Sequence, residues 1–368
     1  MIAAAYAVLD LDAFQHNLAK VRGCAPGAKV MAVVKANGYG HGVLRIAEAL
    51  QDADAFAVAR VDEGIRLRRA GLKNRIAVME GFTCADEVDD LLAFQLEPLL
   101  HSFSQLDILK TRKEQQALSA WLKIDTGMNR LGFKARDFSA VYARLSDCSI
   151  IRQPVNLMTH LANADDKNDD KTLKQIRLFN ETVGAFPGQR SIANSAGILG
   201  WRESLADWVR PGVMLYGISP FPDSTGQALG LKPVMSLHSR LIAVKPILEG
   251  ETVGYGGNWL CKKNTTLGVV AIGYGDGYPR YAKAGTPVLV NGKRVPLVGR
   301  VSMDMITVDL TTQPDAKPGD AATLWGDGLA VEEIARYADT IAYTLVCGIT
   351  PRVQIIEGVS THKINSAR

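Results

Sequence analysis

The chain has 368 residues, of which 47% are hydrophobic and 22% are charged, as is typical of globular proteins. This length exceeds what one hydrophobic core usually fills, so it predicts two domains and excludes a small disulfide-stapled module. A mean hydropathy of +0.02 leaves too little apolar surplus for a bundle of membrane spans. The net charge of +4 is mild and spread along the chain, so no nucleic-acid partner is expected.

The five cysteines stand far apart and form no CxxC pair, and no histidine spacing suits zinc. We therefore expect neither a disulfide framework nor a metal site. The N-terminal segment has a short apolar run, but it lacks a basic leader and is interrupted by Asp10 and Asp12. These features predict a cytoplasmic protein with reduced thiols and no membrane partner.

From about residue 9 to residue 217, amphipathic helical stretches alternate with short apolar runs, a pattern typical of parallel strands connected by helices. Eight strands are expected, at Val30–Lys35, Phe56–Arg60, Ile76–Gly81, Leu96–His101, Trp121–Asp125, Val155–His160, Ser191–Asn194 and Val213–Tyr216. Eight parallel strands close a TIM-like (β/α)8 barrel, which we place at residues 1–232. An open doubly wound sheet with a miscounted strand is the alternative.

After about residue 232 the sequence becomes rich in β-forming runs separated by glycine, proline and asparagine. These runs are LHSRLIAV, TLGVVAI, TPVLVNG, KRVPLVG and DMITVDL, and one helical stretch lies near 331–337. The α/β barrel is thus expected to be followed by a mostly β domain at residues 233–368, with 219–233 as the linker.

Lys35 ends the first expected strand in the segment MAVVKANGYGHG, and several glycines follow it. The carboxyl ends of barrel strands carry the active site, and a desolvated lysine there becomes a nucleophile for carbonyls. The alternative is a lysine that marks the strand end and extends to water.

Asn194 and Ser195 end the seventh expected strand, and Arg210 and Gly212 lie at the start of the eighth. Barrels commonly bind phosphate in this region. The alternative is a turn of small residues in which Ser195 caps a helix. A nucleophilic lysine together with a phosphate cradle indicates pyridoxal 5'-phosphate (PLP), a carbonyl cofactor that needs both.

Seven segments in this order resemble bacterial alanine racemases: AVVKANGYGHG, KIDTGMNRLGF, NSAG, DWVRPG, VGYGG, IGYGDGYPR and VGRVSMDM. They cover nearly the whole chain and both expected domains. The resemblance implies a PLP-dependent isomerase that interconverts L-alanine and D-alanine, for peptidoglycan synthesis or for alanine catabolism. It also implies a homodimer.

The resemblance makes Lys35 the lysine that carries the cofactor and the base on one face of the substrate, and Tyr255 the base on the other face. Inverting a chiral carbon requires one group on each face, one to remove the α-proton and one to return it. The family assigns His160 to contact that tyrosine. If the resemblance is left aside, the alternative is that His160 is a hydrogen-bonded residue at a strand end.

Arg210 resembles the arginine that contacts the pyridine nitrogen of the cofactor. A guanidinium only donates hydrogen bonds, so the ring nitrogen would stay unprotonated and transamination would be restrained. Arg130 resembles a residue near the phenolic oxygen of the cofactor and the substrate carboxylate. Lys123 matches a position that is carbamylated in many relatives; unmodified, it would repel Arg130.

The phosphate cradle of the family corresponds here to Tyr39, Ser195, Gly212 and Val213. Met303, whose backbone would lie near the substrate carboxylate, and Asp304 match a stretch that reaches the active site of the partner subunit. Tyr274 matches a tyrosine that lines the same entrance. Because these residues and Tyr255 fall in the expected β domain, each active site would be shared between two subunits.

Two residues depart from the family pattern. Ser302 stands where some relatives have a cysteine, and Pro351 stands where some have a phosphate-binding tyrosine. Four alternatives stay open: a PLP-dependent decarboxylase, a racemase of broad specificity, a PLP-binding protein without turnover and a cofactor-free aldolase. The decarboxylase would lack Tyr255, and the PLP-binding protein would have no use for Tyr255 and Met303.

Overall fold

The computed structural model describes residues 3–112 and 116–358. The chain forms two compact units. One unit comprises Asn17–Leu215, and the other comprises Met1–His16 together with Tyr216–Arg368. The expected division at residue 232 stays a prediction; the first residues of the chain belong to the same unit as the β-rich segment.

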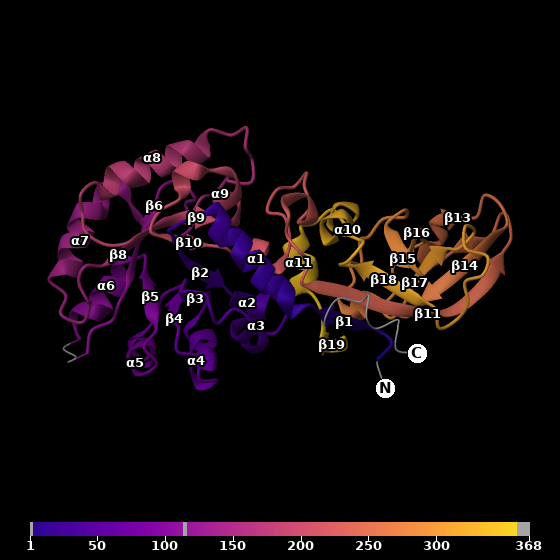
Figure 1. Ribbon diagram of the computed structural model, residues 1–368, viewed down its shortest axis with the longest axis horizontal. Helices are drawn as coiled ribbons and strands as arrows, with labels where there is room; N and C mark the ends of the chain where they lie inside the picture. The colour runs from indigo at the N-terminus through magenta and orange to yellow at the C-terminus, as the bar shows by residue number, and fades with distance from the viewer. Residues whose placement is uncertain (1–2, 113–115, 359–368) are drawn as a thin grey trace. The chain divides into compact units, whose positions relative to one another are not determined.

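The first unit is a closed barrel of eight parallel strands with helices around it (Figure 1). Each strand pairs with the next around the barrel, and the last pairs with the first. The strands in this order are β2 (Lys29–Val33), β3 (Ala55–Val58), β4 (Arg75–Val78), β5 (Glu97–Leu100), β6 (Trp121–Asp125), β8 (Asn156–Met158), β9 (Arg190–Asn194) and β10 (Trp208–Arg210). The short β7 (Phe133–Lys134) adds to β6.

Helices connect these strands, as the alternating pattern predicts. They are α3 (Val43–Ala49), α4 (Val61–Arg69), α5 (Ala85–Ala93), α6 (Phe103–Lys110), α7 (Phe138–Ser146), α8 (Lys171–Val183) and α9 (Ser195–Gly200), with α1 (Leu11–Cys24) preceding β2. Helix α4 has Asp62 in its first turn and Arg68 and Arg69 in its last, so these charges interact favourably with the helix dipole.

The expected eighth strand at Val213–Tyr216 is wrong: this segment is the 3-10 helix η3. It is apolar because it is fully buried, and burial alone does not distinguish a strand from a helix. The eighth strand is β10, whose last residue is the buried Arg210. Arg210 therefore lies at the carboxyl end of the barrel rather than at the start of a strand.

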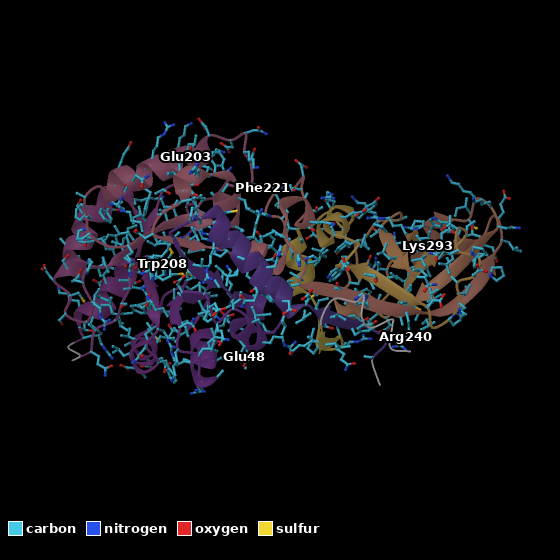
Figure 2. All side chains as sticks on the ribbon, viewed as in Figure 1. Glu48, Glu203, Trp208, Phe221, Arg240 and Lys293 are labelled. Carbon is cyan, nitrogen blue, oxygen red and sulfur yellow. The ribbon has the colours of Figure 1, made fainter. Side chains whose placement is uncertain are left out.

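Large side chains close the amino end of the barrel. Trp121 and Trp208, the first residues of β6 and β10, meet edge to face with ring centroids 5.9 Å apart (Trp208 is labelled in Figure 2). Glu97 accepts hydrogen bonds from Arg75 Nε (2.6 Å) and Trp121 Nε1 (3.0 Å). A barrel sealed at this end leaves its carboxyl end for ligands.

The second unit is a mostly β domain, as expected. Its strands are β1 (Tyr6–Leu9), β11 (Met235–Ile247), β14 (Thr265–Val270), β15 (Pro287–Val290), β16 (Lys293–Val298), β17 (Ile306–Asp309), β18 (Ala321–Trp325) and β19 (Gln354–Glu357). The long β11 pairs with β14, β18 and β1. Strand β1, which the sequence did not predict, joins β11 to β19.

Two helices, α10 (Val331–Tyr337) and α11 (Ala342–Cys347), complete this unit, together with a small hairpin of β12 (Thr252–Val253) and β13 (Trp259–Leu260). Within the described residues, no helix combines the length and apolarity that a bilayer span requires.

Candidate active site

Lys35 follows β2 at the carboxyl end of the barrel and begins an unusual turn, α2 (Lys35–Tyr39). Ala36, Asn37, Gly38 and Tyr39 have φ between 50° and 64°, so the chain makes a left-handed turn. This conformation costs free energy for residues other than glycine, and such strain concentrates at functional sites. The side chain of Asn37 supports the turn by accepting a hydrogen bond from the Val43 N–H (3.1 Å).

The left-handed turn places Tyr39 against the loop after β10. A Cβ atom on Gly212 would lie 2.6 Å from the Tyr39 hydroxyl oxygen, so any larger residue there would have to displace Tyr39. Ser195 Oγ accepts hydrogen bonds from the backbone N–H groups of Gly212 (2.9 Å) and Met214 (3.4 Å). Three of the expected cradle residues thus converge, and the fourth, Val213, lies between these two N–H groups.

Asn194, not Ser195, caps helix α9: its side chain accepts a hydrogen bond from the Gly197 N–H at 2.9 Å. The alternative reading of Ser195 as a helix cap is therefore wrong, and its hydroxyl is engaged with the loop after β10 instead.

Arg210 is almost fully buried, with 1% of its surface exposed. Its guanidinium donates to Ser191 Oγ (2.6 Å) and to the carbonyls of Thr159 (2.6 Å) and Ile192 (3.1 Å). Burial lowers its pKa to about 9, so it stays charged at neutral pH. No carboxylate among the described residues forms an ion pair with it.

His160 lies next to Arg210, with 3.4 Å between its Nδ1 and Arg210 Nη2. Burial, followed by the positive charges of Arg210, Lys123, Arg130 and Lys35, lowers the pKa of His160 well below its ordinary value. The imidazole is therefore neutral at pH 7. Because a guanidinium only donates, this contact assigns the remaining proton to Nε2.

Lys123 is buried on β6, and no carboxylate among the described residues forms an ion pair with it. Burial first, then the charges of Arg210 and Arg130, lower its pKa from 10.5 to about 8. The nearby Asp125 only partly opposes this shift, since Lys134 Nζ (2.6 Å) binds that carboxylate. Arg130 is exposed. Lys35, Lys123, Arg130 and Arg210 thus form a group of interacting cations.

Tyr255 lies in the other unit, at the tip of the β12–β13 hairpin, and is 68% exposed. Gly254, Gly256 and Gly257 all have positive φ, which makes the turn tight. When the amide of Asn258 is oriented to satisfy its neighbours, it donates to the Gly256 carbonyl (2.9 Å) and accepts from Arg300 Nε (2.7 Å). The sequence did not single out Asn258 or Arg300.

Tyr274, Met303 and Asp304 lie together in two loops of the same unit. The Tyr274 N–H donates to the Ser302 carbonyl (3.0 Å), and the Gly275 N–H donates to the Met303 carbonyl (2.8 Å). Arg352, next to Pro351, binds Asp304 (2.7 Å) and Asp276 (3.2 Å). Side chains of Tyr274 and Met303 stay 40% and 52% exposed.

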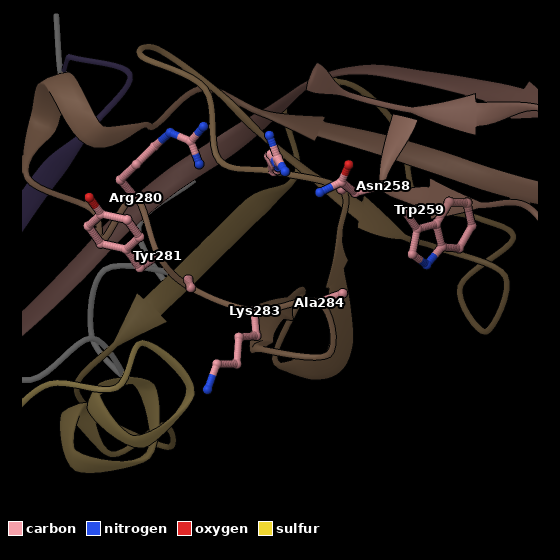
Figure 3. Close-up of a pocket in the computed structure, with 9 residues that line it drawn as sticks. Asn258, Trp259, Arg280, Tyr281, Lys283 and Ala284 are labelled. Atoms are coloured by element: carbon pink, nitrogen blue, oxygen red, sulfur yellow. The ribbon is translucent and has the colours of Figure 1, made fainter. Parts of the chain in front are cut away.

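A pocket of about 300 Å³ adjoins the Tyr255 turn (Figure 3). Asn258 and Trp259 form one side of it, and Arg280, Lys283 and Arg300 contribute positive charge. The pocket lies wholly within the second unit, and its three cations suit an anionic group.

The barrel residues fit PLP. Lys123 and Arg210 are buried without a carboxylate partner, and Lys35 and Arg130 are exposed beside them; such a group favours anions, which a phosphate, a phenolic oxygen and a substrate carboxylate supply. Gly212 leaves room beside the Tyr39 hydroxyl, and Lys35 is the amine at the strand end. Among the described residues, no cluster of side chains suits a metal ion.

These features describe a two-domain barrel protein with a group of cations at the carboxyl end of its barrel. Two family descriptions match the chain: alanine racemase, N-terminal domain, over residues 9–220, and alanine racemase, C-terminal domain, over residues 234–357. The chain therefore belongs to the alanine racemase family, and is an isomerase, which confirms the resemblance.

Individual relatives agree. The chain is 52% identical to an alanine racemase of Shewanella sediminis, over 95% of this chain and 98% of that one. It is similar to the crystal structure of biosynthetic alanine racemase from Pseudomonas aeruginosa, with a TM-score of 0.94, 42% identity and coverage of 97% and 100%. The alanine racemase of Bartonella henselae, described with covalently bound pyridoxal phosphate, has a TM-score of 0.87, 30% identity and coverage of 97% and 100%.

Proposed function

We propose that this protein interconverts L-alanine and D-alanine with PLP held by the barrel residues. The buried Arg210, with no carboxylate beside it, is the observation that supports this proposal most directly. A serine hydroxyl and two carbonyls hold its guanidinium in place at the carboxyl end of the barrel, and a pyridine nitrogen that stays unprotonated is a suitable further acceptor for its remaining donors. The covalently bound cofactor of the Bartonella henselae relative supports the same assignment.

When bound, PLP withdraws electrons from the α-carbon of the amino acid and so acidifies its proton. Lys35 would hold the cofactor and serve one face of the α-carbon. Tyr39, Asn194, Ser195, Gly212 and Val213 would hold its phosphate. The absence of a tyrosine at Pro351 removes one phosphate contact that some relatives have.

Tyr255 would serve the opposite face from the partner subunit of a homodimer, with Tyr274, Met303 and Asp304 beside it. Its exposed position on a tight hairpin supports this role, because an exposed tyrosine is available to a second chain. The neutral His160, with a proton on Nε2, would donate a hydrogen bond to the phenolic oxygen of Tyr255 and stabilise its ionised form.

Arg130 would bind the substrate carboxylate, and Lys123 would be carbamylated. A pKa of about 8 leaves part of the Lys123 amine neutral, and only the neutral amine attacks carbon dioxide. The lysine cation first loses one proton; its neutral nitrogen then bonds to the carbon of carbon dioxide, one C=O bond becomes a C–O⁻ bond, and a second proton leaves the nitrogen. The cation thus becomes an anion beside Arg130. We place the protein in the cytoplasm, where Cys24, Cys84, Cys148 and Cys261, which form no disulfide, would stay reduced.

The test is incubation of the purified protein with PLP and L-alanine in D₂O, followed by chiral chromatography and mass spectrometry. We expect D-alanine that carries deuterium at the α-carbon. Loss of carbon dioxide would support the decarboxylase instead, and PLP binding without exchange would support a carrier. The intact mass measured near neutral pH should exceed the mass of the unmodified chain by one carbon dioxide. Lys123→Arg should abolish this increment.

A further inference from the structure

Glu63 on helix α4 connects two neighbouring strand ends at the mouth of the barrel. Its Oε1 accepts a hydrogen bond from the Ala36 N–H (2.9 Å), directly after Lys35. Its Oε2 accepts one from the Ala59 N–H (2.7 Å), directly after β3. One half-buried carboxylate therefore satisfies two backbone donors that belong to different loops.

The contact with Ala36 lies where the backbone begins its left-handed turn. Ala36 has φ 52° and ψ 51°, a conformation that alanine does not adopt without support. A hydrogen bond to the N–H of the Lys35–Ala36 peptide fixes the plane of that peptide, and so the direction in which Lys35 leaves the strand. A charged acceptor makes this a strong hydrogen bond.

Glu87 shows that this bridge is more than an ordinary helix start. Glu87 is the third residue of α5, as Glu63 is of α4, and it accepts from the N–H (2.6 Å) and hydroxyl (2.9 Å) of Thr83. Both partners of Glu87 lie in its own loop. Glu63, unlike Glu87, also contacts the loop after a second strand, β2, where Lys35 lies.

We propose that Glu63 is a positioning residue for Lys35, holding the peptide after it through the Ala36 N–H. This proposal rests on the function proposed above, in which Lys35 carries the cofactor. In Glu63→Gln a single amide oxygen faces two donors, and its NH₂ group opposes one of them. The Lys35 turn should then loosen while the fold persists, because α4 keeps its buried apolar face.

Two measurements on the full chain test the proposal, with Glu87→Gln as the matched control. The first is hydrogen exchange of the 35–40 segment without cofactor, which Glu63→Gln should accelerate about tenfold or more. The second is the rate at which Lys35 captures PLP, followed by borohydride reduction and the mass of the Lys35 peptide. Capture should slow by about tenfold in Glu63→Gln and stay near wild type in Glu87→Gln.

Equal capture rates in the two variants, or an unchanged exchange rate of the 35–40 segment, would overturn the proposal and leave Glu63 as a helix cap. Glu63→Asp provides a second variant if Glu63→Gln does not fold: it keeps the charge but is too short to reach both donors, so capture should again slow. Neither readout requires alanine. A wild-type protein that captures PLP but does not racemise alanine would contradict the proposed function and not the role of Glu63.

Discussion

At the scale of the residue, Gly212 shows how closely the expected cradle is packed. Its missing side chain leaves room for Tyr39, whose hydroxyl would lie 2.6 Å from an added Cβ. Gly212→Ala is allowed by the backbone, because φ at this position is not positive. The variant should therefore lose stability only by displacing Tyr39, at a cost of about 1–3 kcal/mol in the free energy of unfolding.

This displacement should also weaken PLP binding, by about tenfold if one hydrogen bond to the phosphate is lost. Urea unfolding and titration with PLP measure the two effects. Gly23→Ala is the control, since an added Cβ there meets no atom within 4 Å in helix α1. It should raise stability by about 0.5–1 kcal/mol. Unchanged PLP affinity in Gly212→Ala would show that Tyr39 and Gly212 do not help to bind the phosphate.

Single residues also show what the sequence could predict. The segments around Lys35, Arg130 and Arg210 were recognisable because their motifs are local. The contacts between them are not, since the Tyr39 hydroxyl meets Gly212 only when the barrel closes. Glu63 carried one local signal: it lies three residues after Arg60, the spacing of a capping box, and its side chain is near the Arg60 N–H (3.4 Å).

The left-handed turn at 36–39 holds an alanine at a backbone conformation that favours glycine. Ala36→Gly should leave the free energy of unfolding unchanged or raise it by up to about 1 kcal/mol, because glycine adopts positive φ without strain. Ala19→Gly in the exposed face of helix α1 should instead lower it by about 1 kcal/mol. Chemical denaturation compares the two. Equal losses would mean that the turn is not strained at Ala36.

Elements also differ in how well their sequences predict them. Seven barrel strands are runs of apolar residues bounded by turns, so their positions agree with the structure. Strand β10 is only Trp208–Arg210, and the longer apolar run Val213–Tyr216 that follows it has the stronger pattern of a buried strand. Strand β1 precedes a helix of the barrel in sequence, yet it pairs with β11 and β19. Pairing between such distant segments leaves no local pattern.

At the scale of the whole molecule, the buried His238 of the second unit couples stability to pH. Burial lowers its pKa from 6.5 to about 4. Between these values the unfolded chain binds more protons, so the free energy of unfolding falls as the pH falls; above pH 6.5 the contribution is complete. The contribution of His238 to the free energy of unfolding should be about 2 kcal/mol smaller at pH 5 than at pH 7.5.

His238→Phe tests this coupling, because it keeps a ring beside Tyr6, which stacks on His238 with centroids 5.3 Å apart. Urea titrations at pH 7.5 and pH 5 should show that the free energy of unfolding falls more in the wild type than in the variant. Substitution of the exposed His16 by glutamine should leave the loss as in the wild type. A variant with the full wild-type loss would show that other groups cause the acid sensitivity.

The two expected bases lie in different units of the chain. Lys35 lies in the barrel unit and Tyr255 in the β unit. If each active site combines Lys35 of one subunit with Tyr255 of its partner, a dimer of one Lys35→Ala chain and one Tyr255→Phe chain contains one intact site and one that lacks both groups. Either variant alone has no intact site.

Co-expression of the two variants in equal amounts should therefore restore about a quarter of the wild-type racemase activity, since half of the dimers are hybrids and each has one working site. Tandem affinity purification of differently tagged chains would isolate the hybrids and raise this to about half. If both bases instead came from one chain, each site in the hybrid would lack one group. The isolated hybrid would then be as inactive as the parent variants, and the shared site would be excluded.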